Sequence, residues 1–214
     1  MTFQRARRPE HKQQRSEAIL AAARTLAERD GVRAVSLADI AAAVGVHKSA
    51  LLRYFETREE IYLRLAADDW RSWVAGMRAA LADLAPGDVA GVAAALATTL
   101  AELPLLCDLM IHAPLNLERN VSLESARTFK HAAVGSVAEI AAEVRTVLPK
   151  LTEAGAYDLV GSMSMVAAGL WQIGHPTATL LELYAEEPEL GHENLPFVPT
   201  VTRFAETYIK GLLA

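Results

Sequence analysis

The chain has 214 residues, of which 52% are hydrophobic and 6% aromatic, with one cysteine and a net charge of −5. A single cysteine excludes an internal disulfide, and no apolar run reaches the length of a membrane span. Residues 1–58 carry 11 basic and 6 acidic side chains, whereas the remaining residues carry 10 basic and 20 acidic ones. We therefore expect a cytoplasmic protein outside the membrane, with a basic end that attracts phosphate and an acidic body that repels it.

Alanine-rich segments whose apolar residues recur at helical spacing predict an all-α fold. Residues 1–11, which contain three arginines and Pro9, are predicted to form a flexible basic arm. A first helix is predicted from Gln13 to Asp30, and it ends at Gly31.

The 23 residues from Ser36 to Arg58 predict two short helices around a glycine turn. Ser36 is expected to cap the first of these helices, with Asp39 closing a reciprocal capping box. Gly45 follows at the point where the end of a helix needs a positive φ. The apolar face of this helix consists of Leu37, Ile40, Ala41 and Val44.

The second short helix is predicted to run from Val46 to Phe55 as a rigid rod that turns Leu51 inward. Thr57 and the residues after it have the pattern of a further helix start, so the next helix is expected to begin at Arg58 without a linker. Two short helices joined in this way form a helix-turn-helix, which predicts duplex DNA as a partner.

The order of these elements resembles the DNA-binding domain of the tetracycline-repressor (TetR) family of bacterial regulators. The resemblance covers roughly residues 12 to 65. It is carried by Ile19, Ala22 and Ala23, by Leu37, Ile40, Ala41, Val44, Gly45 and Val46, and by Leu51, Tyr54, Phe55 and Arg58–Glu59–Glu60. It implies a three-helix DNA-binding domain over residues 12–57 and an all-helical effector-binding and dimerisation domain over residues 58–214.

Eight residues are predicted to contact DNA: Ser36, His47, Lys48, Ser49, Leu52, Arg53, Tyr54 and Arg58. The resemblance implies that Lys48 and Ser49 face base edges in the major groove, where Lys48 can donate to guanine. For Leu52 two interpretations are open, a contact with a thymine methyl group and packing on the preceding helix.

Phosphate contacts are expected from Ser36, Arg53 and Tyr54. Arg58 is expected to hold one phosphate together with the free N–H groups of its own helix. The arm over residues 1–11 would either enter the minor groove or serve only as a solubilising tail.

After Arg58, caps and prolines predict a series of further helices. They cover 58 to about 84, 89 to about 103, 104–112, 123–148, 153–173, 178–185 and 200–213. Residues 132–142 and 155–169 are rich in glycine, alanine and serine, which favours close approach of another backbone. The resemblance implies that these two helices form a four-helix bundle with a second copy, so we expect a homodimer that binds a palindromic operator.

A pocket in the body is predicted to bind a small apolar or aromatic effector, because tryptophan and methionine can line such a pocket. The same residues at helical spacing also fill an ordinary core. The pocket residues are expected to be Trp70, Trp73, Met77, Met110, His112, Phe129, Met163 and Trp171, with His112 or Gln172 as the polar anchor.

The sequence thus predicts a ligand-responsive transcriptional regulator, and the resemblance implies a repressor that its effector releases from DNA. Ligand binding is expected to shift the protein toward a state in which the helix that begins at Arg58 has pivoted. A body that binds a protein partner is the alternative. An all-α enzyme is the other rival, but the chain has no phosphate-binding glycine loop, nucleophile elbow or zinc-ligand spacing, so no cofactor or metal is expected.

Overall fold

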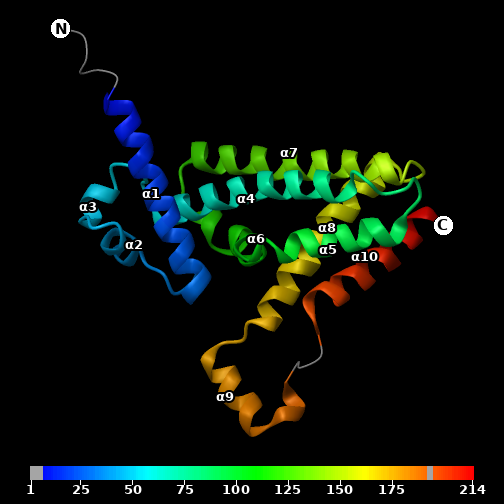
Figure 1. Cartoon of the computed structure of the whole chain (residues 1–214). Coiled ribbons are helices and arrows are strands. Elements are labelled where there is room, and N and C mark those ends of the chain that lie inside the picture. The colour runs from blue at the N-terminus through cyan, green and yellow to red at the C-terminus, as the bar shows by residue number, and fades with distance from the viewer. Residues whose placement is uncertain (1–6, 192–194) are drawn as a thin grey trace.

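The computed structural model describes residues 7–191 and 195–214, which form ten α-helices and two 3-10 helices without a strand (Figure 1). The predicted all-α fold is confirmed. The elements are α1 (Arg7–Asp30), α2 (Leu37–Ala43), α3 (Lys48–Leu51), α4 (Arg58–Leu81), α5 (Val89–Ala101), α6 (Pro104–Leu115), η1 (Leu117–Arg119), α7 (Leu123–Val147), α8 (Glu153–Gly174), α9 (Ala178–Glu186), η2 (Pro188–Leu190) and α10 (Phe197–Leu213).

Helices α1, α2 and α3 form a small unit at one end of the molecule (Figure 1). Ile19 of α1, Ile40 of α2 and Leu51 of α3 are fully buried, and Phe55 packs beside them. The inward direction predicted for Leu51 is therefore confirmed. Burial of each such side chain contributes about 1.5–3 kcal/mol, so these few residues account for much of the unit's cohesion.

The start of α1 differs from the prediction. The helix begins at Arg7, six residues before Gln13, because Pro9 falls in the first turn, where its missing N–H would have no partner in any case. Residues 7–11, which were expected to belong to a flexible arm, are therefore part of α1. Residues 1–6 of that arm lie outside the described residues.

The body is organised around α4, which lies lengthwise against α7, while α5 lies beside α10 (Figure 1). Helix α8 contacts α6, α7 and α10 and so joins the two pairs. The space between the helices is filled by fully buried side chains such as Trp73 and Met77 of α4, Leu96 and Leu100 of α5 and Leu106 of α6.

Three predicted caps in the body are confirmed. Asp88, Ser122 and Thr152 each accept a hydrogen bond from the backbone N–H three residues later, at 2.8, 3.2 and 3.0 Å. Each cap satisfies one N–H group that the helix itself leaves without a partner. Cap chemistry therefore determined where these helices begin.

Two predicted helix ends near proline are wrong. Helix α6 continues past Pro114, because this proline lies in the last turn and the chain still closes the turn with the Asn116 N–H donating to the His112 carbonyl at 2.9 Å. Helix α10 begins before Thr200, because Pro199 falls in its first turn, where proline is tolerated.

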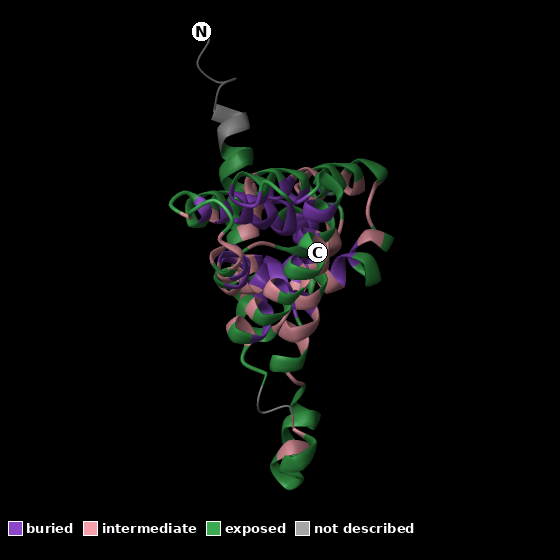
Figure 2. Cartoon of the chain, turned by 90° about the vertical axis from the view of Figure 1, so that its right-hand side faces the viewer, coloured by how far each residue is buried: buried purple, intermediate pink, exposed green. Residues whose placement is uncertain are grey.

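Helix α9 and η2 extend away from the body (Figures 1 and 2). No residue of α9 is buried, and Leu180 and Leu181 are exposed. Figure 2 shows this extension as exposed and intermediate chain below the buried layers. It therefore adds little to the core.

Among the described residues, no single helix has both the length and the apolar composition needed to cross a membrane. The pair α5 and α6 meets these requirements only when taken together, across a bend of 84°.

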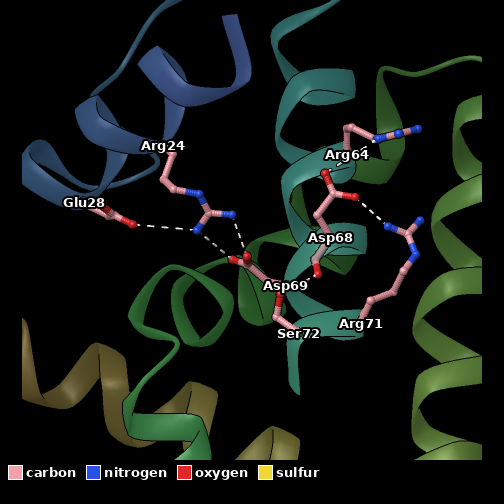
Figure 3. A network of polar contacts seen from close by, with 7 residues as sticks. All are labelled: Arg24, Glu28, Arg64, Asp68, Asp69, Arg71 and Ser72. Atoms are coloured by element: carbon pink, nitrogen blue, oxygen red, sulfur yellow. Dashed lines mark hydrogen bonds and ion pairs between the residues drawn. The ribbon is translucent and has the colours of Figure 1, made fainter. Parts of the chain in front are cut away.

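An ion pair ties α1 to α4 (Figure 3). Arg24 donates to both carboxylate oxygens of Asp69, at 2.5 and 3.2 Å, and Asp69 is only 3% exposed. Burial raises the pKa of Asp69 against the opposing influence of Arg24, so the arginine is what keeps the buried charge tolerable. The adjacent Asp68 has a side chain that is 40% exposed and instead pairs with Arg64 and Arg71 along the outside of α4.

We predict that Asp69→Ala lowers the free energy of unfolding by about 2–3 kcal/mol, because it leaves the partly buried Arg24 with only the exposed Glu28, at 3.7 Å, as an acidic partner. Asp68→Ala, one residue away, should cost less than about 1 kcal/mol, since its ion pairs are exposed. Urea denaturation of the two variants tests this difference. Equal losses would contradict the role given to the Arg24–Asp69 pair.

Candidate nucleic-acid interface and interdomain cleft

The turn between α2 and α3 is set by local hydrogen bonds. Ser36 Oγ accepts from the Asp39 N–H at 3.3 Å, and the Asp39 carboxylate accepts from the Ser36 N–H at 2.8 Å, so the predicted capping box is confirmed. Gly45 has a φ of 69°, and the Val46 N–H donates to the Ala41 carbonyl at 3.0 Å. The glycine lets the chain reverse tightly, and α3 is therefore held at a defined angle to α2.

The second helix of this pair is shorter than predicted. Helix α3 covers only Lys48–Leu51, and the chain continues to Phe55 through turns such as the one closed by the Tyr54 N–H and the Leu51 carbonyl at 2.9 Å. The predicted rod from Val46 to Phe55 is corrected in this respect. No side chain caps α3, because His47 occupies the N-cap position without forming a cap hydrogen bond.

Five of the predicted DNA contacts share the outer surface of this unit. Lys48 and Arg53 bring positive charge, and Leu52, at 44% exposure, faces solvent rather than the core. These five, all exposed and all at or next to α3, are His47, Lys48, Ser49, Leu52 and Arg53. The surface thus combines hydrogen-bond donors with one apolar side chain, which is a composition suited to base edges and phosphates.

Two other predicted contacts are partly engaged within the chain. The Ser36 hydroxyl donates to the Asp39 carboxylate at 2.6 Å, so its proton already has an acceptor. Tyr54 is half-buried and packs against the core of the unit. Either residue would offer only part of its polar group to a phosphate.

The guanidinium of Arg58, which was expected to hold a phosphate, turns inward in the structure. Nε donates to the Val35 carbonyl at 2.7 Å, Nη2 donates to the Val32 carbonyl, and Nη1 pairs with Glu59 at 3.0 Å. The group also lies 5.0 Å from the ring centre of Tyr62. Instead of reaching for a phosphate, Arg58 joins the start of α4 to the loop between α1 and α2.

The same loop is held from the other side by Asp108 of α6. Its carboxylate accepts from the Val32 N–H at 3.1 Å and from the Gln172 side chain of α8 at 2.7 Å, and it lies 3.3 Å from His112 Nε2. Burial raises the pKa of Asp108, but the bonds from His112, Gln172 and Val32 outweigh it and hold the pKa below the usual value. Asp108 is therefore a charged tie between the body and the N-terminal unit.

These contacts lie at a cleft of about 600 Å³ between the end of α1 with the loop that follows it, α6, and the end of α8. Asp108, His112, Trp171 and Gln172 are part of its lining. Trp171 stacks on His175, with ring centres 3.8 Å apart. The cleft therefore combines a carboxylate with an aromatic surface.

The structure brings together only two of the eight predicted pocket residues, His112 and Trp171, in this cleft. Phe129 lies in a separate hollow of about 310 Å³ between α1, α4 and α7. Trp73 and Met77 are core residues, since Trp73 Nε1 donates to the Thr99 hydroxyl at 2.9 Å and that hydroxyl contacts the Met77 sulfur at 3.2 Å. The remaining residues, Trp70, Met110 and Met163, also lie outside the cleft lining.

Sequence analysis did not identify Asp108 as a site residue. A signal was present, because Asp108 and His112 are four residues apart and therefore share one face of a helix.

Cys107, which precedes Asp108, is buried, and burial raises the pKa of its thiol to about 12, which makes it a poor nucleophile at neutral pH.

Family models match two adjoining parts of the chain. Residues 19–65 match a model described as "Bacterial regulatory proteins, tetR family", and residues 67–214 match one described as "Tetracyclin repressor-like, C-terminal domain". No curated protein sequence gives a significant match.

Solved structures share the fold along nearly the whole chain. A protein from Mesorhizobium loti described as a TetR-family transcriptional regulator is 15% identical, with a TM-score of 0.58, and the match covers 94% of this chain and 96% of that one. The fatty acid degradation regulator FadR from Bacillus halodurans is 16% identical, with a TM-score of 0.52 and coverage of 93% and 94%. SmeT, the repressor of the Stenotrophomonas maltophilia efflux pump SmeDEF, is 17% identical, with a TM-score of 0.50 and coverage of 92% and 89%.

We predict that the stabilising effect of Asp108 depends on pH. At pH 7 the free energy of unfolding of the wild type should exceed that of the Asp108→Asn variant. This difference should shrink as the pH falls below about 4, because the carboxylate of the unfolded chain takes up a proton before that of the folded chain does. Urea denaturation between pH 3 and 7 measures it, with the exposed Asp83→Asn as control. A difference that stays constant over this range would contradict the lowered pKa of Asp108.

Proposed function

The chain belongs to the tetracycline-repressor (TetR) family of DNA-binding transcriptional regulators, and we propose that it is a repressor that binds a palindromic operator as a homodimer and is released by a small-molecule effector. The observation that carries this proposal is the exposed, donor-rich surface of the helix-turn-helix beside a cleft at the junction with the body. SmeT, which has the same fold, is a repressor, and this supports the same role here.

For DNA recognition, Lys48 and Ser49 of α3 are assigned to base edges in the major groove. His47 and Arg53 flank them and are assigned to phosphates, and Leu52 is assigned to an apolar contact such as a thymine methyl group. The positive charge of residues 1–58 and the negative charge of the rest would orient the encounter, because phosphate is attracted only at one end.

The exposed surfaces of α7 and α8 support a homodimer. Met165 of α8 is 71% exposed, and Val134 of α7 and Tyr157 of α8 also face solvent. Added Cβ atoms at Gly161 and Gly169 would meet open space within this chain, so these glycines leave room for a second backbone. Since one short recognition helix contacts few base pairs, two related by a two-fold axis would give a palindrome its specificity.

Release by an effector would follow from the contacts at the junction. Helix α4 begins at Arg58, which holds the carbonyl groups of the loop between α1 and α2, and Asp108 holds an N–H group of the same loop. A ligand that favours another position of α4 or α6 would change the orientation of α3. It would lower DNA affinity only to the extent that it binds the two states differently.

Lys48→Ala should reduce the preference for the operator by roughly 1–3 kcal/mol at one base pair, because it removes a base-edge donor. A preferred duplex is first selected from a random pool. Fluorescence anisotropy then measures the affinity of each protein for this duplex and for variants that each carry one base-pair change. Lys150→Ala, an exposed lysine at the far end of the body, is the matched control and should leave the preference unchanged. Equal weakening of all duplexes by Lys48→Ala would assign Lys48 to phosphate instead.

Met165→Glu should convert the dimer to a monomer, since it places a charge in the apolar surface proposed for contact between copies. Sedimentation velocity compares it with the wild type and with Leu115→Glu, which changes another exposed apolar side chain, at the end of α6. A wild-type monomer, or a Met165→Glu variant that stays dimeric, would refute the proposed interface.

A further inference from the structure

Asp108 is a charged group in the cleft that has no arginine or lysine partner within the described ranges. Its carboxylate, with the side chain 14% exposed, is held by the Val32 N–H, the Gln172 amide and the His112 ring. His112 acts as a cation only when it is protonated. The dipoles around Asp108 therefore stabilise a negative charge that no permanent cation neutralises, whereas buried carboxylates in proteins are usually paired.

His112 provides a second and independent observation. The residue is 7% exposed, and its Nδ1 atom is buried and has no hydrogen-bond partner among the residues that the structure describes. Most buried polar side-chain atoms have such a partner, so a buried nitrogen without one points to a missing group. His112 lines the cleft, whereas its Nδ1 atom is covered by the chain, so a bound molecule would reach this atom only after a shift of the neighbouring side chains.

The rest of the lining favours a positively charged aromatic molecule. Trp171, stacked on His175, lines the same cleft as Asp108, and the face of an indole attracts cations. The charged side chains in the lining are three carboxylates and two guanidinium groups. Arg29 and Asp30 bind each other at 2.7 Å, and Glu28 pairs with Arg24 at 3.7 Å. Of the charges that then remain in the lining, Arg33 is exposed, whereas the Asp108 side chain is only 14% exposed.

We propose that the cleft binds an organic cation in which a primary ammonium group is attached to an aromatic ring system, with the ammonium on Asp108 and the ring against Trp171. The volume of about 600 Å³ is sufficient for a molecule of this size. The inference rests on the proposed function in taking this cation to be the effector of the regulator.

Binding at Asp108 would act directly on the DNA-binding unit. An ammonium group competes with the Val32 N–H for a carboxylate oxygen, and a full positive charge is the stronger partner in a partly buried site. The loop between α1 and α2 would then lose its tie to α6 and keep only the bonds from Arg58. The cation would thereby favour a state in which the body holds the unit less firmly, while the bonds from Arg58 and the Arg24–Asp69 pair remain.

The test compares two probes of nearly equal shape, 1-naphthylmethylammonium and the neutral 1-naphthylmethanol. Their affinities for the full-length protein are measured by titration calorimetry at pH 8, where an ordinary imidazole is neutral. The ammonium should bind at least about tenfold more tightly than the alcohol, and Asp108→Asn should reduce this ratio to about threefold or less. Asp83→Asn is the matched control and should keep the wild-type ratio.

A second variant keeps the test valid if Asp108→Asn is poorly folded. Trp171→Leu, at the half-buried end of α8, should weaken both probes by a similar factor, because it removes the aromatic surface and leaves the carboxylate. Equal affinities of the two probes for the wild type would overturn the proposal. So would a charge preference that survives Asp108→Asn, or a Trp171→Leu variant that binds both probes as the wild type does.

The effector role is tested separately with operator duplex. The ammonium probe should weaken operator binding by the wild type, whereas the alcohol should not. If the protein bound no duplex at any ionic strength, the proposed function would fail while cation binding in the calorimeter would still stand. If it bound the operator but not the cation, only the present inference would fail.

Discussion

The backbone of the loop between α1 and α2 has its polar groups satisfied by side chains of the body, and the position of the N-terminal unit depends on this constraint. Val32 offers an N–H to Asp108 and a carbonyl to Arg58, and Val35 offers its carbonyl to Arg58 as well. Because buried backbone groups rarely remain without partners, the loop cannot leave the body without replacing these bonds. The orientation of α3 is thus determined by residues on α4 and α6.

Local chemistry explains which parts of the fold could be predicted from sequence. The caps at Ser36 and Asp88 and the turn at Gly45 depend on a few neighbouring residues, so their pattern identifies them. The end predicted at Pro114 was wrong because the sequence pattern does not tell whether a proline lies in the terminal turn of a helix or follows it. Long-range partners left no such pattern: the adjacent Asp68 and Asp69 differ in burial because Asp69 faces Arg24 of α1, whereas Asp68 lies on the outside of α4.

The candidate site shows the same division. The outward direction of Lys48 followed from the spacing of the helix, whereas the inward direction of Arg58 depends on a loop that precedes it by more than twenty residues. For the ligand site, tryptophan and methionine at helical spacing are as compatible with a core as with a cavity, and Trp73 proved to be core. The cleft could not be located from sequence, because it forms where two domains meet.

The position of α10 has a consequence for the order in which the helices can pack during synthesis. Val201, Ala205 and Ile209 are fully buried against α5 and α8, although they are synthesised after both of those helices. Helices α5 and α8 therefore emerge from the ribosome with their apolar sides uncovered, whereas the N-terminal unit can fold as soon as α4 follows it. A chain truncated before α10 would have a folded N-terminal unit but a body with exposed apolar surface on α5 and α8. Chaperones and proteases act on surfaces of this kind.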